Sequence, residues 1–112
     1  MKATIWHNPR CSKSRQALAI LQDAAGVEVE VFEYLKAAPS RADIEAVLAK
    51  AGVAPSQAVR KGEDAAKGID LTDEAAILDA MAAHPILIER PIVVTDKGAV
   101  IARPPEKALD VL

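Results

Sequence analysis

The first 31 residues contain three successive hydrophobic patterns, and their order restricts the fold more than any other feature of the sequence. Residues 2–6 form a short, largely apolar run that predicts a strand. Residues 12–25 carry Ala and Leu at helical spacing, and Gly26 follows as a stop. Residues 27–31 alternate valine with glutamate, which predicts a strand with one solvated face at a sheet edge. Strand, helix and strand in this order predict a βαβ unit with two parallel strands.

The middle of the chain predicts helices joined by polar segments. Ser40 and Asp43 have the spacing of a capping box, and the helix that they begin is expected to run to Gly52. A short helical stretch is expected after Pro55. Residues 61–70 are polar and contain two glycines, which predicts a surface connection with one helical turn.

A further helix and a hairpin follow this connection. Thr72 is expected to cap a helix that ends at the approach to Pro85. Residues 91–94 and 99–102 predict two short strands, and the turn at residues 96–98 joins them as a hairpin.

A terminal helix completes the pattern, with Ala108, Leu109 and Leu112 expected to face the core. The whole order is βαβ, a helical insertion and ββα. This order predicts an α/β fold in which helices pack on a mixed four-stranded sheet. At 112 residues the chain suits one hydrophobic core, so we expect a single domain over residues 1–112.

Composition excludes several classes of protein. Hydrophobic residues make up 51% of the chain and charged residues 27%, as in globular rather than disordered proteins. The net charge of −2 gives no reason to expect binding to nucleic acid or to a membrane surface. A single cysteine excludes an internal disulfide framework and is typical of a reducing compartment. Because no signal peptide or long apolar run is present either, we expect a cytoplasmic location.

The single cysteine, Cys11, lies where the first strand turns into the first helix. The unpaired N–H groups and the dipole of a helix start favour an anion, and a thiolate is such an anion. Arg10, Lys13 and Arg15 add three positive charges within four residues of the sulfur. In such surroundings the pKa of a cysteine falls below its free value of about 8.5. We therefore expect a reactive thiolate that also attracts an oxyanion substrate.

The alternative is that Cys11 is a buried, inert side chain, as lone cysteines commonly are. The polar residues Arg10, Ser12, Lys13 and Ser14 flank it on both sides and argue against an apolar environment. They favour the reactive interpretation.

A thiol at the first strand-to-helix turn, together with a proline at the start of the hairpin strand, is similar to the arrangement of the thioredoxin fold. In that fold the hairpin proline is typically cis and faces the thiol. By this analogy we expect a cis peptide bond before Pro91.

Four stretches of the chain, in this order, resemble the glutaredoxin-coupled arsenate reductases of the ArsC type, in particular their short ArsC-like members. The stretches are HNPRCSKSR (residues 7–15), the pair Arg60 and Lys61, HPILIERPIVV (residues 84–94), and ARPPE with the apolar segment after it (residues 102–112). Together they span nearly the whole chain. Their combination is specific, whereas a single stretch is not.

The resemblance implies a mechanism and a set of site residues. Cys11 would attack arsenate and form a thiol-linked arsenic adduct, and His7 would help to lower the pKa of the thiol. Arg60, Arg90 and Arg103 would bind the oxyanion. Bidentate guanidinium groups suit a tetrahedral oxyanion, and their charge offsets the repulsion between thiolate and substrate. No bound cofactor or metal is implied, but glutathione acts as co-substrate and glutaredoxin reduces the mixed species so that arsenite leaves.

The remaining residues of the cysteine segment are secondary candidates. They are Ser12, Lys13, Ser14, Arg15 and, in the hairpin strand, Pro91. Many family members carry Gly-Thr after the cysteine, where this chain has Ser12 and Lys13, so the local charge differs and the identity of the substrate is open. The chain also stops soon after Arg103, whereas longer members continue.

Other thiol-based functions are partly excluded by spacing. A phosphatase-like arsenate reductase has an arginine six residues after its cysteine, but position 17 is Ala17, which excludes that class. A dithiol oxidoreductase has a second cysteine in a C-x-x-C pair, but position 14 is Ser14. A resolving thiol must therefore come from another molecule. Two alternatives stay open: a monothiol glutathione-dependent oxidoreductase with another substrate, and a non-enzymatic Spx-like adaptor that binds RNA polymerase.

Overall fold

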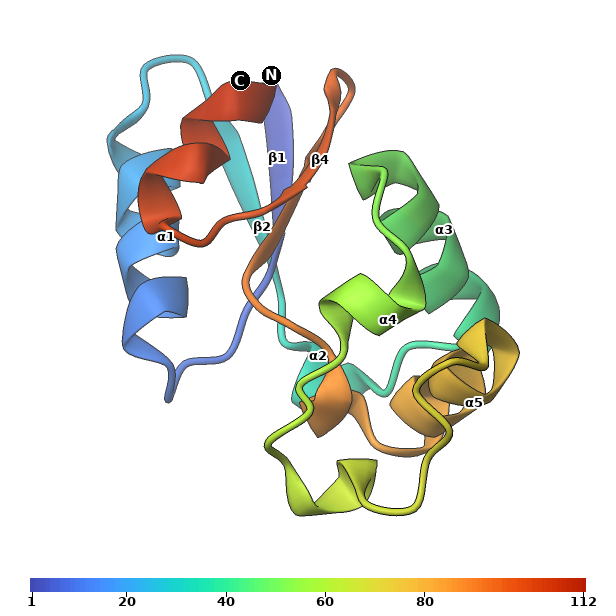
Figure 1. The fold of residues 1–112 in the computed structure, drawn as a ribbon. Coiled ribbons are helices and arrows are strands. Elements are labelled where there is room, and N and C mark those ends of the chain that lie inside the picture. The colour runs from blue at the N-terminus through green and yellow to red at the C-terminus, as the bar shows by residue number, and fades with distance from the viewer. The chain divides into compact units, whose positions relative to one another are not determined.

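The computed structural model describes residues 1–112 and divides the chain into two compact units. The first unit combines residues 1–37 with residues 90–112, and the second consists of residues 38–89 (Figure 1). The second unit corresponds to the predicted helical insertion. A single domain over residues 1–112 stays a prediction.

The first unit is a mixed four-stranded sheet in the order β2-β1-β3-β4. Strand β1 pairs in parallel with β2 and antiparallel with β3, and β3 pairs antiparallel with β4. The strands and the long helix of this unit are β1 (Lys2–Trp6), α1 (Ser12–Asp23), β2 (Glu28–Phe32), β3 (Ile92–Thr95) and β4 (Gly98–Ile101). The predicted βαβ unit, its edge strand β2 and the hairpin are therefore confirmed.

Helix α1 and the C-terminal 3₁₀ helix η3 (Pro105–Val111) lie on the same side of this sheet (Figure 1). Their inward side chains join those of β1 and β3 in one apolar core that includes Ile5, Leu21 and Val93. Because β1 and α1 both contribute to this core, the turn between them is held at both ends.

The C-terminal segment differs from the predicted helix in its period. A 3₁₀ helix repeats every three residues, so Pro105, Ala108 and Val111 face the core. Leu109 is 53% exposed, and its predicted inward position is wrong. Leu112 is half-buried against the core, in agreement with the prediction.

Several details of the first unit were predicted incompletely. Helix α1 ends at Asp23 rather than at residue 25, and a one-turn helix, α2 (Tyr34–Ala37), follows β2. The expected cis peptide bond before Pro91 is confirmed, and a second one precedes Pro104.

The second unit is helical. It contains α3 (Arg41–Ala51), α4 (Pro55–Ala58), the 3₁₀ turn η1 (Asp64–Ala66), α5 (Glu74–Ala83) and the 3₁₀ turn η2 (Pro85–Leu87). The buried faces of α3 and α5 carry Ile44 and Leu48 on one helix and Ile77 and Met81 on the other.

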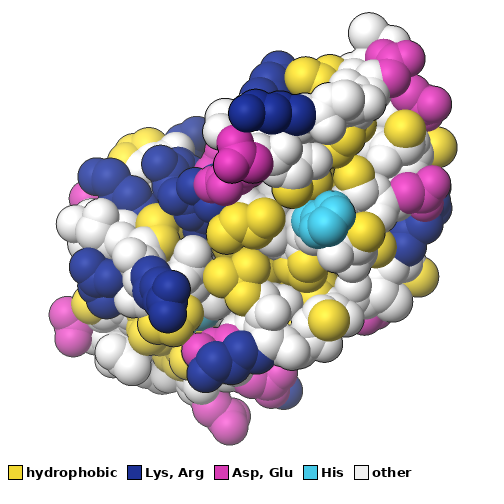
Figure 2. Space-filling view, turned by 90° about the horizontal axis from the view of Figure 1, so that it is seen from below, with side chains coloured by type: hydrophobic (Ala, Val, Ile, Leu, Met, Phe, Trp, Pro, Cys, Tyr) yellow, Lys and Arg dark blue, Asp and Glu magenta, His cyan; other side chains and the backbone are white.

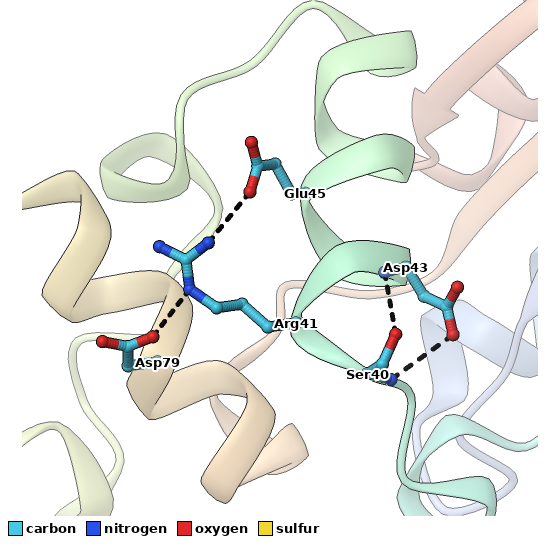
Figure 3. A network of polar contacts seen from close by, with 5 residues as sticks. All are labelled: Ser40, Arg41, Asp43, Glu45 and Asp79. Carbon is cyan, nitrogen blue, oxygen red and sulfur yellow. Dashed lines mark hydrogen bonds and ion pairs between the residues drawn. The ribbon is translucent and has the colours of Figure 1, made fainter.

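Polar contacts fix the start of α3 and connect it to α5 (Figure 3). Ser40 Oγ accepts a hydrogen bond from the Asp43 N–H at 3.1 Å, and Asp43 Oδ2 accepts from the Ser40 N–H at 3.4 Å. This reciprocal pair confirms the predicted capping box. Arg41 bridges the two helices by pairing with Glu45 at 3.0 Å and with Asp79 at 2.6 Å.

The start of α5 corrects one prediction. Asp73, not Thr72, is the N-cap, because its side chain accepts a hydrogen bond from the Ala76 N–H at 3.1 Å. Thr72 lies one residue before the N-cap, and its hydroxyl donates to Asp70 Oδ1 at 2.6 Å.

The face of the molecule drawn in Figure 2 carries side chains of both signs of charge. Lys and Arg side chains lie among Asp and Glu side chains on the face drawn in Figure 2, with hydrophobic side chains between them. None of the helices combines the length and the apolar character that crossing a membrane requires.

Candidate active site

The segment between β1 and α1 is a tight turn that places Cys11 directly before the helix. The Cys11 N–H donates to the Asn8 carbonyl oxygen at 3.0 Å, which closes a β-turn with Pro9 at its second position. The Arg10 N–H donates to Asn8 Oδ1 at 3.0 Å. Cys11 is thereby the N-cap residue of α1, in the extended conformation usual for that position.

Three buried polar residues hold this turn against the first turn of α1. His7, Asn8 and Ser14 are 6%, 8% and 0% exposed. Ser14 Oγ accepts from the Asn8 N–H at 3.0 Å and lies 2.7 Å from His7 Nδ1. The His7 N–H donates to the Phe32 carbonyl oxygen at 2.9 Å, so the contacts extend to the end of β2.

The Cys11 thiol is half-buried, and its pKa lies below the ordinary value. Burial by itself would raise this pKa, but hydrogen bonding of the sulfur to the Ser14 and Lys13 N–H groups and the charge and hydrogen bond of Arg90 outweigh it. The side chain does not make the short capping bond that an Asp or Ser oxygen makes. The N–H groups instead favour the thiolate at the helix start, as in other reactive cysteines.

Of the two predicted sources of this pKa shift, the N–H groups of the helix start are confirmed and the neighbouring charges need correction. The charges of Arg10, Lys13 and Arg15, which are near Cys11 in sequence, are not among the groups that lower its pKa. All three side chains are exposed, where water screens their charge, and Lys13 acts through its backbone N–H. Arg15 Nη1 donates to the Pro9 carbonyl oxygen at 2.8 Å and thereby supports the turn.

Two of the three predicted oxyanion-binding arginines belong to the same unit as Cys11. Arg90 immediately precedes the buried Pro91, and its guanidinium interacts with the thiol. Arg103 follows β4 and reaches back across the hairpin, where its Nη1 donates to the Arg90 carbonyl oxygen at 3.2 Å. The hairpin therefore brings Arg90 and Arg103 together.

The third arginine, Arg60, lies in the helical unit. Its backbone N–H donates to the Leu87 carbonyl oxygen at 2.7 Å. Its guanidinium pairs with Glu63 at 2.9 Å and donates to the Ile86 carbonyl oxygen at 3.4 Å. These contacts fix the side chain within its own unit, and its role toward an oxyanion stays a prediction.

His7 has a pKa below its ordinary value. Burial is the main cause and the charge of Arg15 adds to it, whereas Glu33 acts in the opposite direction. The imidazole is therefore neutral at neutral pH, and its link to Cys11 runs through Ser14 rather than through a positive charge.

Sequence reasoning missed two features of this site. Asn8 was not singled out, although it accepts from the backbone of both Arg10 and Cys11. The Asn-Pro pair is a turn signal that points to this residue. Ser14 was a secondary candidate, interpreted only as a polar neighbour of Cys11, but it is fully buried and holds His7 and Asn8. Ser12, the other flanking serine, is exposed.

The arrangement combines a nucleophile with an anion-binding environment. A thiolate stabilised by N–H groups and a guanidinium can attack an electrophilic centre that carries negatively charged oxygens. The structure contains no group of three or more His, Cys, Asp and Glu side chains placed to hold a metal ion.

Comparisons with known proteins connect this site to one family. The model of the ArsC family matches residues 6–111. An arsenate reductase of Rhizobium meliloti strain 1021 is 47% identical over 100% of this chain and 82% of its own length. An arsenate reductase of Neisseria meningitidis serogroup A is 40% identical, with 96% of each chain covered, so its length is similar. The solved structure of an arsenate reductase from Vibrio cholerae has a TM-score of 0.92 and 39% identity, covering 100% of this chain and 98% of that one.

Proposed function

Because the chain belongs to the ArsC family, we propose that it reduces arsenate to arsenite, with Cys11 as the nucleophile. The observation that carries the proposal is the lowered pKa of a half-buried thiol beside Arg90. A thiolate is the reactive form of cysteine, and a neighbouring guanidinium can bind the anion that the thiolate must attack. The names of the relatives at 37–47% identity supply the substrate.

In the first step the Cys11 sulfur forms a bond to arsenic, and one arsenate oxygen leaves as water after protonation. Arsenic is still pentavalent in this adduct. The two electrons that convert it to arsenite come from two external thiols. We propose that these are the thiol of glutathione and a thiol of glutaredoxin, which end joined as a mixed disulfide. Water then breaks the bond between the Cys11 sulfur and trivalent arsenic, so that arsenite leaves and the Cys11 thiol is restored.

The proposed roles of the other residues follow from their positions. Arg90 stabilises the thiolate and one oxygen of the substrate, and Arg103 holds the Arg90 backbone and adds a second positive charge to the hairpin. His7 acts as a positioning residue through Ser14. Arg60 is proposed as a further ligand of the oxyanion.

The test is the release of arsenite from arsenate in the presence of glutathione and glutaredoxin, with thioredoxin as the comparison donor. We expect turnover with glutaredoxin, none with Cys11→Ser, and a loss of about tenfold or more for Arg60→Ala, Arg90→Ala and Arg103→Ala. Circular dichroism of each variant checks that the fold is retained.

Two outcomes would contradict the proposal. Turnover by Cys11→Ser near that of the wild type would exclude Cys11 as the nucleophile. Reduction of a simple disulfide without any arsenite release would favour the monothiol oxidoreductase instead, which uses the same thiolate on another substrate. An arginine variant with wild-type turnover would exclude that arginine from the site.

A further inference from the structure

A small pocket lies beside the cysteine turn, at the carboxyl ends of the parallel strands β1 and β2. It has a volume of about 200 Å³, and its walls come from the β1–α1 turn and from the segment around α2. The residues that line it include Asn8, Arg10, Glu33, Leu35 and Lys36. In α/β sheets the crevice outside the carboxyl ends of parallel strands is where ligands bind.

The pocket is more positive than negative and has an apolar wall. Arg10 and Lys36 contribute two positive charges and Glu33 one negative charge, which leaves one positive charge in excess. Lys36 Nζ lies 3.7 Å from Glu33 Oε1, and the Lys36 side chain is 80% exposed, so this pair is loose enough to accept another anion. Leu35 is 38% exposed and offers apolar contact.

The volume and the position limit what the pocket can hold. Sites that enclose a whole drug-sized molecule have volumes of ~300 Å³ or more, so a pocket of about 200 Å³ suits one end of a ligand. Asn8, which lines the pocket, and Cys11 are the two ends of one hydrogen-bonded β-turn, with Cα atoms less than ~7 Å apart. A tripeptide spans up to ~10 Å when extended, so a ligand with one end in the pocket can reach the sulfur.

We infer that this pocket binds a carboxylate-bearing end of a small peptide thiol, with Arg10 and Lys36 as the charged contacts and Leu35 beside the peptide. This inference rests on the proposed function, which requires glutathione as co-substrate. The pocket would position the external thiol for attack above the Cys11 turn. It assigns roles to Arg10 and Lys36, whose charges do not lower the pKa of Cys11.

The first experiment measures thiol–disulfide exchange and needs no arsenate. The Cys11 thiolate attacks one sulfur of oxidised glutathione, the S–S bond breaks, and one glutathione leaves as its thiolate while the other stays bound to Cys11. The rate constant is divided by that for bis(2-hydroxyethyl) disulfide, which carries no charge. This ratio cancels changes in the nucleophilicity of Cys11 itself.

We expect the wild type to react faster with oxidised glutathione than with the uncharged disulfide. In the double variant Arg10→Gln/Lys36→Gln the ratio of the two rate constants should be about three- to tenfold lower. Lys97→Gln/Lys107→Gln, which removes two positive charges from exposed side chains of the same unit, is the matched control and should keep the wild-type ratio. An unchanged ratio in the double variant would overturn the inference.

The second experiment detects binding directly. S-methylglutathione, which cannot exchange, is titrated into the protein and followed by amide NMR. Shifts concentrated at residues 8–10 and 33–36 are expected, and they should weaken in the double variant. Shifts confined to other residues, or none at millimolar concentrations, would refute the pocket. Neither experiment uses arsenate, so a failed arsenate assay leaves the result on the pocket unchanged. A failed pocket experiment likewise leaves the result of the arsenate assay unchanged.

Discussion

Arg90 is the side chain whose charge lowers the pKa of Cys11, although it lies far from Cys11 in the sequence. Arg90→Gln removes the charge and is expected to raise this pKa, because the thiolate then has only the N–H groups of the helix start to stabilise it. The alkylation rate of Cys11 measured against pH gives the midpoint. We expect it to move upward in the variant.

Arg103→Gln provides the comparison for this prediction. Arg103 contacts the Arg90 carbonyl oxygen, and its charge is not among the causes of the Cys11 shift. The midpoint of Cys11 alkylation in Arg103→Gln should therefore lie closer to that of the wild type than the midpoint in Arg90→Gln does. An equal midpoint in wild type and Arg90→Gln would show that the backbone alone sets the pKa.

At the residue scale, sequence reasoning found the nucleophile and the N–H groups of the helix start that stabilise its thiolate, but it assigned the activating charge to the wrong side chains. The cysteine and its place before a helix follow from local pattern, so Cys11 and the direction of its pKa shift were predicted. The exposure of Arg10, Lys13 and Arg15 depends on how the turn folds, which no local pattern reports. The same holds for Ser14, whose burial results from its bonds to His7 and Asn8.

At the scale of single elements, the start of α5 offers a direct comparison of two adjacent residues. Asp73→Ala removes the side chain that accepts from the Ala76 N–H, and an N-cap of this kind contributes about 1 kcal/mol. Thr72→Ala removes only an exposed hydrogen bond to Asp70 and should change the free energy of unfolding by less than about 0.5 kcal/mol. Urea unfolding of both variants measures the difference. A larger loss for Thr72→Ala would restore Thr72 as the cap.

The period of the C-terminal 3₁₀ helix can be tested by comparing a buried residue with an exposed one. Val111 is 7% exposed and belongs to the core of the sheet unit, so Val111→Ala should cost about 1–3 kcal/mol. Leu109 is 53% exposed, and Leu109→Ala should stay within about 0.5 kcal/mol. Thermal or urea unfolding checks the order. Equal losses would mean that this segment packs with an α-helical period.

Prediction of single elements succeeds where the signal is local. Strand β1, the capping box of α3 and the hairpin are encoded by alternation and by turn residues a few positions apart, and all were predicted. Both periods, α and 3₁₀, bury Ala108, so the choice between them depends on how the segment after Pro105 packs against α1 and β4. Helix α2 spans only four residues and has too few apolar positions to show a period.

At the scale of the whole molecule, the limit of the sequence is the arrangement of distant segments. Residues 90 and 103 flank a hairpin, and a hairpin brings its two ends together, so their proximity could be inferred from local pattern. Residue 60 lies in a separate compact unit and is held there by Glu63 and Ile86. The helical insertion that contains residue 60 was predicted from local pattern, but its separation as a compact unit was not, because one domain over residues 1–112 was expected.

The number of cysteines in the chain leads to the last prediction. Reduction of arsenate to arsenite takes two electrons, and thiols supply them by forming a disulfide. This chain has one cysteine, so it can form the arsenic adduct but cannot complete the reduction within one molecule. Stoichiometric enzyme mixed with arsenate in the absence of other thiols should therefore release no arsenite.

Addition of glutathione and glutaredoxin to that mixture should release arsenite in proportion to the adduct, and Cys11→Ser should release none under either condition. Separation of arsenate from arsenite by chromatography, with mass spectrometry of the intact protein, follows both products. Arsenite release before any thiol is added, accompanied by a Cys11–Cys11 disulfide between two chains, would contradict the prediction, because the second electron-donating sulfur would then come from another copy of this protein.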